Sequence, residues 1–182
     1  MSRLRYAENC SGADRDVSGC MTIRTGKPSE FVPSDKAAFV KFVAAAGEVD
    51  RAILPRLVDD AVALVMLFER DELIGTAAIK TPYSAHRRGE FAKANVAENA
   101  DAFPLELGWV VVHPEYRKRG HAPELVRAAV GLVADQGVYA TTKTPRMLTI
   151  LSECGFKSLG KPYPSFLKPD ALLTLLVRPA GG

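Results

Sequence analysis

The alternation of apolar and polar positions divides the chain into short helices and strands. Apolar residues at helical spacing predict a helix with Ser34 as its N-cap and a second short helix over residues 53–58. Two apolar runs, Val62–Phe68 and Leu73–Ile79, are joined by a tight polar connection and predict a β-hairpin. Met21–Thr25 is expected to form a strand ahead of these elements.

The second half of the chain contains one near-continuous apolar run and then alternating helix and strand patterns. Leu105–Val112 is predicted to be a central strand, because a strand buried on both faces has few polar positions. A polar segment with a helix around Phe91 precedes it. The elements predicted after it are a helix over Pro123–Ala134, a strand over Val138–Thr142, a helix with Thr144 as N-cap and Pro145 as its first residue, and a strand over Ala171–Val177.

Length and composition favour one globular domain over residues 21–182, behind a flexible tail at residues 1–20. The chain of 182 residues is 47% hydrophobic and 25% charged, as in soluble proteins, and a net charge of +3 is too small to indicate nucleic-acid binding. Three scattered cysteines and three histidines argue against a disulfide framework or a structural zinc site. With no membrane span or signal peptide, a reducing cytoplasm is the expected location.

The segment from Arg117 to Ala122 joins the predicted central strand to the next helix. Unpaired amide groups and the positive end of the helix dipole make a helix N-terminus suitable for an anion. Arg117, Lys118 and Arg119 add positive charge, and Gly120 lets a phosphate approach the backbone. The alternative interpretation is a turn with a solvated basic face.

These features resemble the GNAT superfamily of N-acyltransferases, which use acetyl-CoA or a related acyl-CoA. Arg117, Gly120 and Ala122 match its signature of Arg or Gln, two residues, Gly, one residue, and Gly or Ala. Cys154–Phe156 resembles the Gly-Phe pair that closes the family's fourth helix. The resemblance covers about residues 21–178 and implies a mixed α/β (α+β) fold of the acyl-CoA N-acyltransferase type, with a central mixed sheet flanked by helices.

The resemblance implies acetyl-CoA as co-substrate and no metal. In the family, the backbone amides of this loop bind the CoA pyrophosphate. The residues expected to contact CoA are therefore Val110, Val111, Val112, Arg117, Lys118, Arg119, Gly120, His121 and Ala122. Because the amides supply the geometry, Arg117→Ala is expected to weaken binding without abolishing it, whereas a large residue at Gly120 would enter the space of the phosphate.

Glu106 is the candidate general base, because acyl transfer to an amine requires that the amine lose a proton. It is a carboxylate in an otherwise apolar strand, and burial is costly for a carboxylate and raises its pKa. Alternation places Glu106, Gly108 and Val110 on one face and Trp109 on the other, and the small Gly108 is expected to leave room for a substrate. Its spacing from Gly120 matches the catalytic glutamate of some family members. The alternative is a solvated or Arg-paired Glu106 at the mouth of the strand.

The tyrosine that usually serves the family as general acid is absent, since its position is occupied by Leu151. Thr144 likewise replaces the Asn that commonly begins that helix. Tyr163, in a Pro-rich segment, is retained as a candidate acid, whereas Tyr139, in a strand, is expected to pack in the core. Solvent is the alternative proton donor.

The expected activity is N-acetyl transfer to an amine of a small molecule or peptide, with no membrane partner and a homodimer left open. The acceptor is expected near the N-terminal helices and residues 81–104, where Arg87 and Arg88 would bind an acidic acceptor or form an exposed charge pair. Two alternatives are kept. One is an acyl-CoA-binding module with little turnover, and the other is an acyltransferase acting on aminoacyl-tRNA, whose RNA affinity would fall steeply with salt.

Overall fold

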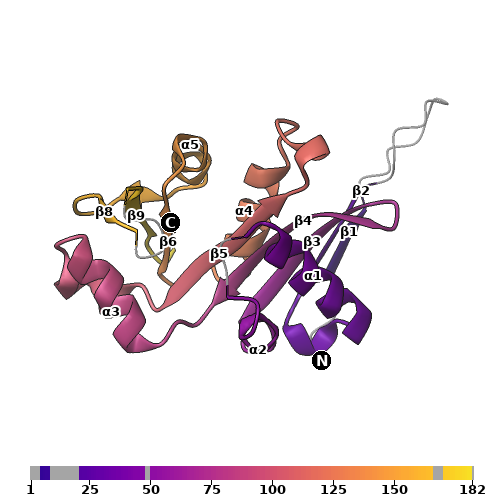
Figure 1. Ribbon diagram of the computed structural model, residues 1–182, viewed down its shortest axis with the longest axis horizontal. Helices are drawn as coiled ribbons and strands as arrows, with labels where there is room; N and C mark the ends of the chain where they lie inside the picture. The colour runs from indigo at the N-terminus through magenta and orange to yellow at the C-terminus, as the bar shows by residue number, and fades with distance from the viewer. Residues whose placement is uncertain (1–4, 9–20, 48–49, 166–169, 182) are drawn as a thin grey trace. The chain divides into compact units, whose positions relative to one another are not determined.

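The computed structural model describes residues 5–8, 21–47, 50–165 and 170–181 (Figure 1). Its strands are β1 (Arg5–Glu8), β2 (Met21–Gly26), β3 (Ala63–Glu69), β4 (Glu72–Lys80), β5 (Leu105–Val112), β6 (Val138–Thr142), β7 (Lys157–Ser158), β8 (Tyr163–Pro164) and β9 (Leu172–Arg178). Its α-helices are α1 (Pro33–Ala45), α2 (Leu54–Asp59), α3 (Ser84–Lys93), α4 (His121–Gly131) and α5 (Pro145–Glu153). Short 3-10 helices are η1 (Pro28–Glu30), η2 (Ala97–Ala102) and η3 (Pro114–Tyr116). The helices and strands predicted from residue 21 onward occur in the predicted order, but α4 begins and ends earlier than the predicted Pro123–Ala134, and the short strands β7 and β8 were not predicted.

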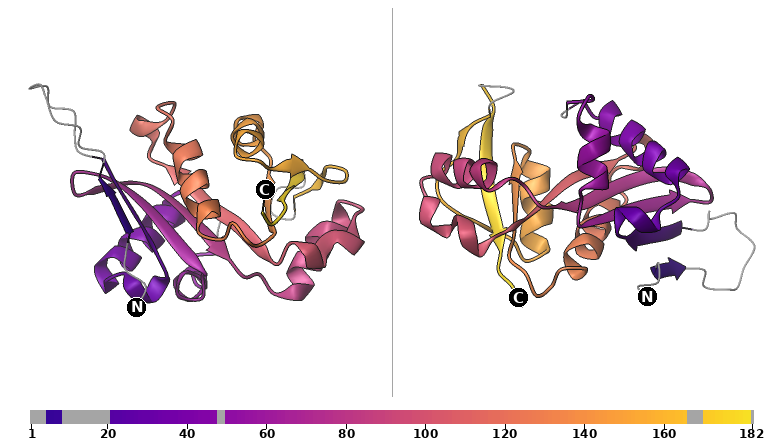
Figure 2. Two further views of the ribbon diagram at one scale, coloured as in Figure 1. Left: turned by 180° about the vertical axis from the view of Figure 1, so that it is seen from behind. Right: turned by 90° about the horizontal axis from the view of Figure 1, so that it is seen from below.

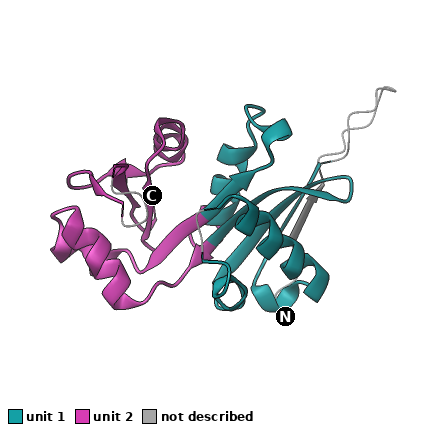
Figure 3. Ribbon diagram, viewed as in Figure 1, with its two compact units in different colours: residues 1–78, 109–129 teal, residues 79–108, 130–182 magenta. Residues whose placement is uncertain are grey.

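The segment predicted to be a tail contains strand β1, which pairs antiparallel with β2. Residues 1–4 and 9–20 of that segment lie outside the described residues. The chain divides into two compact units (Figure 3). Unit 1 comprises residues 1–78 and 109–129, and unit 2 comprises residues 79–108 and 130–182, so that β4, β5 and α4 contribute residues to both.

The core of unit 1 lies on both faces of β3, which follows β1 and β2 in the sheet and neighbours β4. One face packs against α1 and α2 in a cluster that includes Phe39, Val43, Leu54, Val58, Leu64, Met66 and Phe68. On the other face, a Cβ built on Gly75 of β4 would lie 2.9 Å from Leu125 Cδ1 of α4 and 3.5 Å from Leu67 Cβ. Helices α1 and α4 therefore cover opposite sides of these strands (Figure 2).

Helix α1 begins two residues earlier than predicted, and Ser34 is not its N-cap. Val32 is the N-cap, with extended backbone angles and no side-chain cap, and Pro33 occupies the first turn. A proline already has the φ of a helix and lacks the N–H that would be unpaired there, and it also holds the preceding residue extended. Pro33 therefore sets the start of α1. Helix α5 also begins with a proline in its first turn, and its N-cap Thr144 was predicted correctly.

Strand β5 alternates as predicted only as far as Gly108. Leu105 and Leu107 are buried, while Glu106 and Gly108 are partly exposed. Trp109 then takes a φ of 53°, a left-handed conformation found at β-bulges and rare for a bulky residue. Its ring packs edge-on against Phe39, 6.1 Å between centroids, and the partly buried side chain borders the core of unit 1. Trp109 interrupts the alternation of β5. Alternation therefore no longer places Val110 on the same face as Glu106 and Gly108.

Unit 2 contains the parallel pair of strands of the mixed sheet. Strand β5 pairs with β6 through Leu105 opposite Val138 and Glu106 opposite Tyr139. Strand β9 pairs antiparallel with β6, β7 and β8. Helix α3 and η2 pack on these strands through a buried cluster made of Phe91, Ala94, Ala100, Phe103, Tyr139, Tyr163, Leu175 and Val177. This packing places two tyrosine hydroxyls inside unit 2.

The described residues contain neither a membrane-spanning helix nor a cluster of metal-ligating side chains. No helix among them is both long and apolar enough to cross a membrane. No group of three or more His, Cys, Asp or Glu side chains among them is arranged to hold a metal ion.

Candidate active site

The loop that precedes α4 in unit 1 is shaped by two left-handed residues. After η3, Arg117 is extended, Lys118 has a φ of 65° and Gly120 has a φ of 90°. Helix α4 begins directly afterwards at His121. Within the described part of the chain, the amide groups from Lys118 to Ala122 donate no hydrogen bond. The loop therefore presents a row of amide donors at the positive end of a helix, which suits an anion.

Side-chain contacts of Tyr116 and Arg117 tie this loop to strands β3 and β5, while its basic residues are exposed to solvent. Arg117 Nε donates a hydrogen bond of 3.1 Å to the Val112 carbonyl at the end of β5. Tyr116 donates its hydroxyl to Glu69 Oε2 at 2.6 Å, and this bond raises the pKa of Tyr116. The Arg119 guanidinium lies over the Tyr116 ring, 5.2 Å from its centroid. Arg117 thus contributes to the shape of the loop as well as to its charge.

Gly120 is required by backbone conformation rather than by crowding within the protein. A Cβ built on Gly120 would have nothing within 4 Å, so the protein itself leaves space there. Its φ of 90°, however, is one that residues with a side chain rarely adopt. A substitution at Gly120 would therefore distort the loop even before any ligand enters it.

The two histidines beside the loop have acidic neighbours. His121 Nδ1 lies 3.6 Å from Glu124 Oε2 in the first turn of α4. His113 donates its backbone amide to the Ile74 carbonyl of β4 at 2.8 Å, and its Nδ1 lies 4.0 Å from Glu115 Oε2. Both histidines therefore make contacts that help to fix the ends of the loop.

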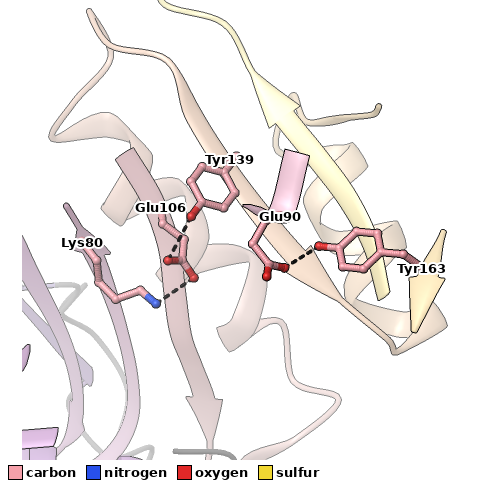
Figure 4. Close-up of polar contacts among 5 residues, drawn as sticks. All are labelled: Lys80, Glu90, Glu106, Tyr139 and Tyr163. Carbon is pink, nitrogen blue, oxygen red and sulfur yellow. Dashed lines mark hydrogen bonds and ion pairs between the residues drawn. The ribbon is translucent and has the colours of Figure 1, made fainter. Parts of the chain in front are cut away.

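In unit 2, Glu106 lies between an ammonium group and a tyrosine hydroxyl (Figure 4). Glu106 Oε1 is 2.7 Å from Lys80 Nζ, and Tyr139 donates its hydroxyl to Glu106 Oε2 at 3.4 Å. The Glu106 side chain is 14% exposed and that of Lys80 is 22% exposed. The residue paired with Glu106 is therefore a lysine at the end of the neighbouring strand β4, where the alternative interpretation had expected an arginine.

The expectation that Gly108 leaves room for a substrate is corrected by the position of Lys80. A Cβ built on Gly108 would lie 2.7 Å from Lys80 Cε and 2.8 Å from Lys80 Nζ. The space beside Glu106 at this point is therefore filled by the Lys80 side chain. Lys80 was missed because its partner lies on another strand. The only signal in the sequence was a lone charge directly after the apolar run that ends at Ile79.

Tyr163, the candidate acid, is buried in unit 2 and bonded to a carboxylate. Its hydroxyl donates a hydrogen bond of 2.6 Å to Glu90 Oε2, and burial together with this bond raises the pKa of Tyr163 far above its usual value. Lys93 Nζ lies 2.7 Å from Glu90 Oε1. Burial acts to raise the pKa of Glu90, but the hydrogen bonds from Lys93 and Tyr163 outweigh it and the pKa is lowered.

Tyr139 combines the packing role predicted for it with a polar contact that was not predicted. Its ring packs edge-on against Phe91, 5.4 Å between centroids, and the residue is fully buried. Burial and the neighbouring Glu106 carboxylate raise the pKa of Tyr139 far above its usual value. Leu151, at the position that the family usually gives to a tyrosine, is an apolar residue buried in α5.

Arg87 and Arg88 of α3 bind the same carboxylate. Their guanidinium groups lie 3.3 Å and 2.9 Å from the two oxygens of Asp101 in η2. The hydrogen bonds from Arg88 and then Arg87 lower the pKa of Asp101. An acidic acceptor at this place would have to compete with Asp101.

A surface groove of about 360 Å³ lies between the two N-terminal helices of unit 1. Its lining residues are Pro33, Lys36, Ala37, Val40, Lys41, Pro55, Val58 and Asp59. An ion pair of 2.6 Å between Lys36 Nζ and Asp59 Oδ1 links α1 to α2. Binding of the acceptor near these helices stays a prediction.

Comparison with known proteins bears on the same regions of the chain. The family model described as "Acetyltransferase (GNAT) family" matches residues 33–150, which include the loop and Glu106. No curated protein matches the sequence significantly. Residues 33–150 make up more than half of the chain, and this match is the finding that assigns the family.

The fold is similar to solved structures of low sequence identity. ElaA of Escherichia coli is 16% identical with a TM-score of 0.63 over 87% of this chain and 99% of that chain. An acyl-CoA N-acyltransferase from Pseudomonas aeruginosa is 14% identical with a TM-score of 0.60, covering 87% and 99%. The ribosomal-protein-S18-alanine N-acetyltransferase of Escherichia coli is 9% identical with a TM-score of 0.61, covering 88% and 95%. These likenesses show a common fold, and the match to the family model shows that the chain belongs to the GNAT family of acetyltransferases, which transfer an acyl group from acyl-CoA.

Proposed function

We propose that this chain is an N-acetyltransferase that moves an acetyl group from acetyl-CoA to a primary amine of a small molecule or peptide. In this proposal the loop from Arg117 to Ala122 binds the CoA pyrophosphate through the amides of Lys118 to Ala122, and Val110 to Val112 contact the cofactor along β5. The support is the row of amide donors at the start of α4, held in place by the two left-handed residues and by the Arg117 bond to Val112. The basic side chains add charge and the backbone supplies the geometry.

The observation that carries the acceptor half of the proposal is the primary ammonium bound to Glu106. Lys80 Nζ lies 2.7 Å from Glu106 Oε1, in a setting where both side chains are largely shielded from water. An acceptor amine presents the same chemical group. Tyr139, which donates to the other carboxylate oxygen, would keep the carboxylate oriented while Oε1 receives a proton. Glu106 is therefore the proposed general base, and Tyr139 is a proposed positioning residue.

The proposed reaction needs a base for the acceptor amine and a proton donor for the leaving thiolate. The acceptor ammonium gives a proton to Glu106, and the neutral amine attacks the thioester carbonyl. A C–N bond forms, the C–S bond breaks and the electron pair leaves with sulfur. The nitrogen releases its second proton to solvent, and the thiolate takes up a proton. Because the raised pKa of Tyr163 makes it a poor donor, we assign that last proton to solvent, with Tyr163 as the candidate to be tested against it.

Two measurements on one sample test this function. Calorimetry with acetyl-CoA measures donor binding, and a thiol assay with a panel of primary amines measures CoA release. The proposal predicts micromolar to millimolar binding and amine-dependent CoA release. Binding without release from any amine would instead support the acyl-CoA-binding module. A strong, salt-sensitive affinity for RNA would support the aminoacyl-tRNA alternative.

A further inference from the structure

We infer that Lys80 is itself an acetyl acceptor, so that the chain acetylates its own Lys80 when acetyl-CoA is present and Glu106 acts as the base. This inference rests on the proposed function, because it uses the same donor and the same carboxylate. It adds a modification site on β4, at a residue outside the loop that binds the donor.

The geometry around Lys80 is that expected of an acceptor amine bound to its general base. Lys80 Nζ is 2.7 Å from Glu106 Oε1, within the distance at which a proton passes directly between a donor and a base (Figure 4). The end of the Lys80 side chain crosses the backbone of Gly108, where a Cβ would come within 2.7 Å of Lys80 Cε. Glycine at this position therefore lets the amine approach Glu106. Any acceptor that uses Glu106 must bring its nitrogen to the place that Lys80 Nζ now occupies.

A second lysine in the same unit provides an internal comparison. Lys93 Nζ lies 2.7 Å from Glu90 Oε1, the same separation as in the Lys80–Glu106 pair. Glu90, however, also accepts a short bond of 2.6 Å from Tyr163, and its pKa is lowered, so it takes up a proton less readily than an ordinary glutamate. The corresponding tyrosine bond to Glu106 is 3.4 Å long. Lys93 is also the more exposed amine, at 47% against 22%, so uncatalysed acetylation would favour Lys93 over Lys80.

The chemical step balances with acetyl-CoA as the only co-reactant. The Lys80 ammonium transfers one proton to Glu106, and the neutral nitrogen attacks the thioester carbonyl. An amide C–N bond forms and the C–S bond breaks, with its electron pair going to sulfur. The nitrogen loses its remaining extra proton to solvent, the thiolate takes up a proton from solvent, and Glu106 later releases its own. The product is a neutral acetyl-lysine that can no longer form an ion pair with Glu106.

Mass spectrometry on the full chain tests the inference without any substitution. The purified protein is incubated with acetyl-CoA and no added amine, and acetylation of each lysine is followed in time by peptide mapping. We expect Lys80 to be acetylated at least about tenfold faster than Lys93, since a positioned base contributes roughly 10²-fold or more. Equal rates at the two lysines, or faster acetylation of Lys93 with Lys80 unmodified, would overturn the inference.

Two matched variants separate catalysis from simple exposure. Glu106→Gln should slow acetylation of Lys80 about 100-fold and leave Lys93 unchanged, while Glu90→Gln should leave the rate at Lys80 unchanged. An unchanged rate at Lys80 in Glu106→Gln would contradict the inference. If that variant does not fold, the ratio of Lys80 to Lys93 in the natural chain still decides. CoA release with external amines, measured in parallel, distinguishes the two failures. Release without modification of Lys80 removes only this inference, whereas the absence of both donor binding and release removes the proposed function as well.

Discussion

The loop before α4 and the carboxylate cluster of unit 2 are built in different ways. The loop offers backbone amides, and its shape depends on the left-handed Lys118 and Gly120. The cluster offers side-chain oxygens, and its properties depend on which ammonium or hydroxyl lies beside Glu106 and Glu90. A backbone site should tolerate changes of side chain as long as φ and ψ are preserved. A side-chain site should respond to the replacement of a single atom.

The largest effect is expected from Glu106→Gln, which replaces one carboxylate oxygen with the NH2 of an amide and removes the negative charge. If Glu106 removes the proton from the acceptor, kcat/KM for an amine should fall by about 10²- to 10⁴-fold, the usual contribution of a general base. Steady-state CoA release measures this change. Turnover equal to that of the natural chain would remove Glu106 as the base.

Glu90→Gln is the matched control for this prediction. Glu90 is likewise a largely buried glutamate paired with a lysine at 2.7 Å and bonded to a tyrosine. We assign it no catalytic role, so the control should retain turnover and lose stability, because the bonds from Lys93 and Tyr163 are weakened. A loss of turnover as large as that of Glu106→Gln would show that the comparison between the two carboxylates is wrong.

The next largest effect is expected from Gly120→Ala. A residue with a Cβ at a φ of 90° costs about 1–2 kcal/mol, which corresponds to an acetyl-CoA affinity roughly tenfold lower if the loop relaxes away from its binding conformation. Gly131→Ala provides the control, because a Cβ there also has nothing within 4 Å and Gly131 lies in α4 without a positive φ. Equal affinities for the two variants would contradict a backbone-made site.

A smaller effect is expected at Arg117, where shape and charge can be separated. Arg117→Lys keeps the positive charge and loses the Nε bond to the Val112 carbonyl. A lost hydrogen bond of this kind is worth about 0.5–1.5 kcal/mol, so acetyl-CoA should bind roughly three- to tenfold more weakly in Arg117→Lys, and more weakly again in Arg117→Ala, which also loses the charge. If Arg117→Lys binds as well as the natural chain, the contribution of Arg117 is charge alone. Calorimetry distinguishes these outcomes.

Tyr163→Phe is expected to affect stability more than turnover. Removing the hydroxyl takes one hydrogen bond from Glu90 and should destabilise the chain by about 1–2 kcal/mol at neutral pH. The folded pKa of Glu90 is lowered, so its contribution to stability is present above the pKa of an unfolded glutamate and is lost as pH falls through the folded value. The difference between variant and natural chain should therefore shrink in acid. Denaturant unfolding at several pH values measures it.

The same variant also tests Tyr163 as general acid. With solvent as the proton donor, turnover of Tyr163→Phe should change less than about threefold, whereas loss of a general acid would reduce it by about 10²-fold or more. A loss of that size would identify Tyr163 as the general acid. It would also contradict the assignment of the proton to solvent.

What could be predicted from the sequence follows the same division between backbone and side chain. The hairpin, the helices and the Arg117–Ala122 loop are encoded in local patterns, and they were predicted within a few residues. Lys80 was missed because its contact with Glu106 is between strands β4 and β5, far apart in sequence. The bulge at Trp109 was missed because a left-handed tryptophan carries no local signal, and it ended the alternation on which the face of Val110 had been predicted.

The most direct test of the account compares donor affinity and turnover in Glu106→Gln and Gly120→Ala on the same preparations. The account predicts that Glu106→Gln binds acetyl-CoA as the natural chain does and loses kcat. It predicts that Gly120→Ala binds the donor about tenfold more weakly and keeps kcat at saturating acetyl-CoA. Loss of both properties in each variant, or full turnover in Glu106→Gln, would contradict the assignment of donor binding to the loop and proton removal to Glu106.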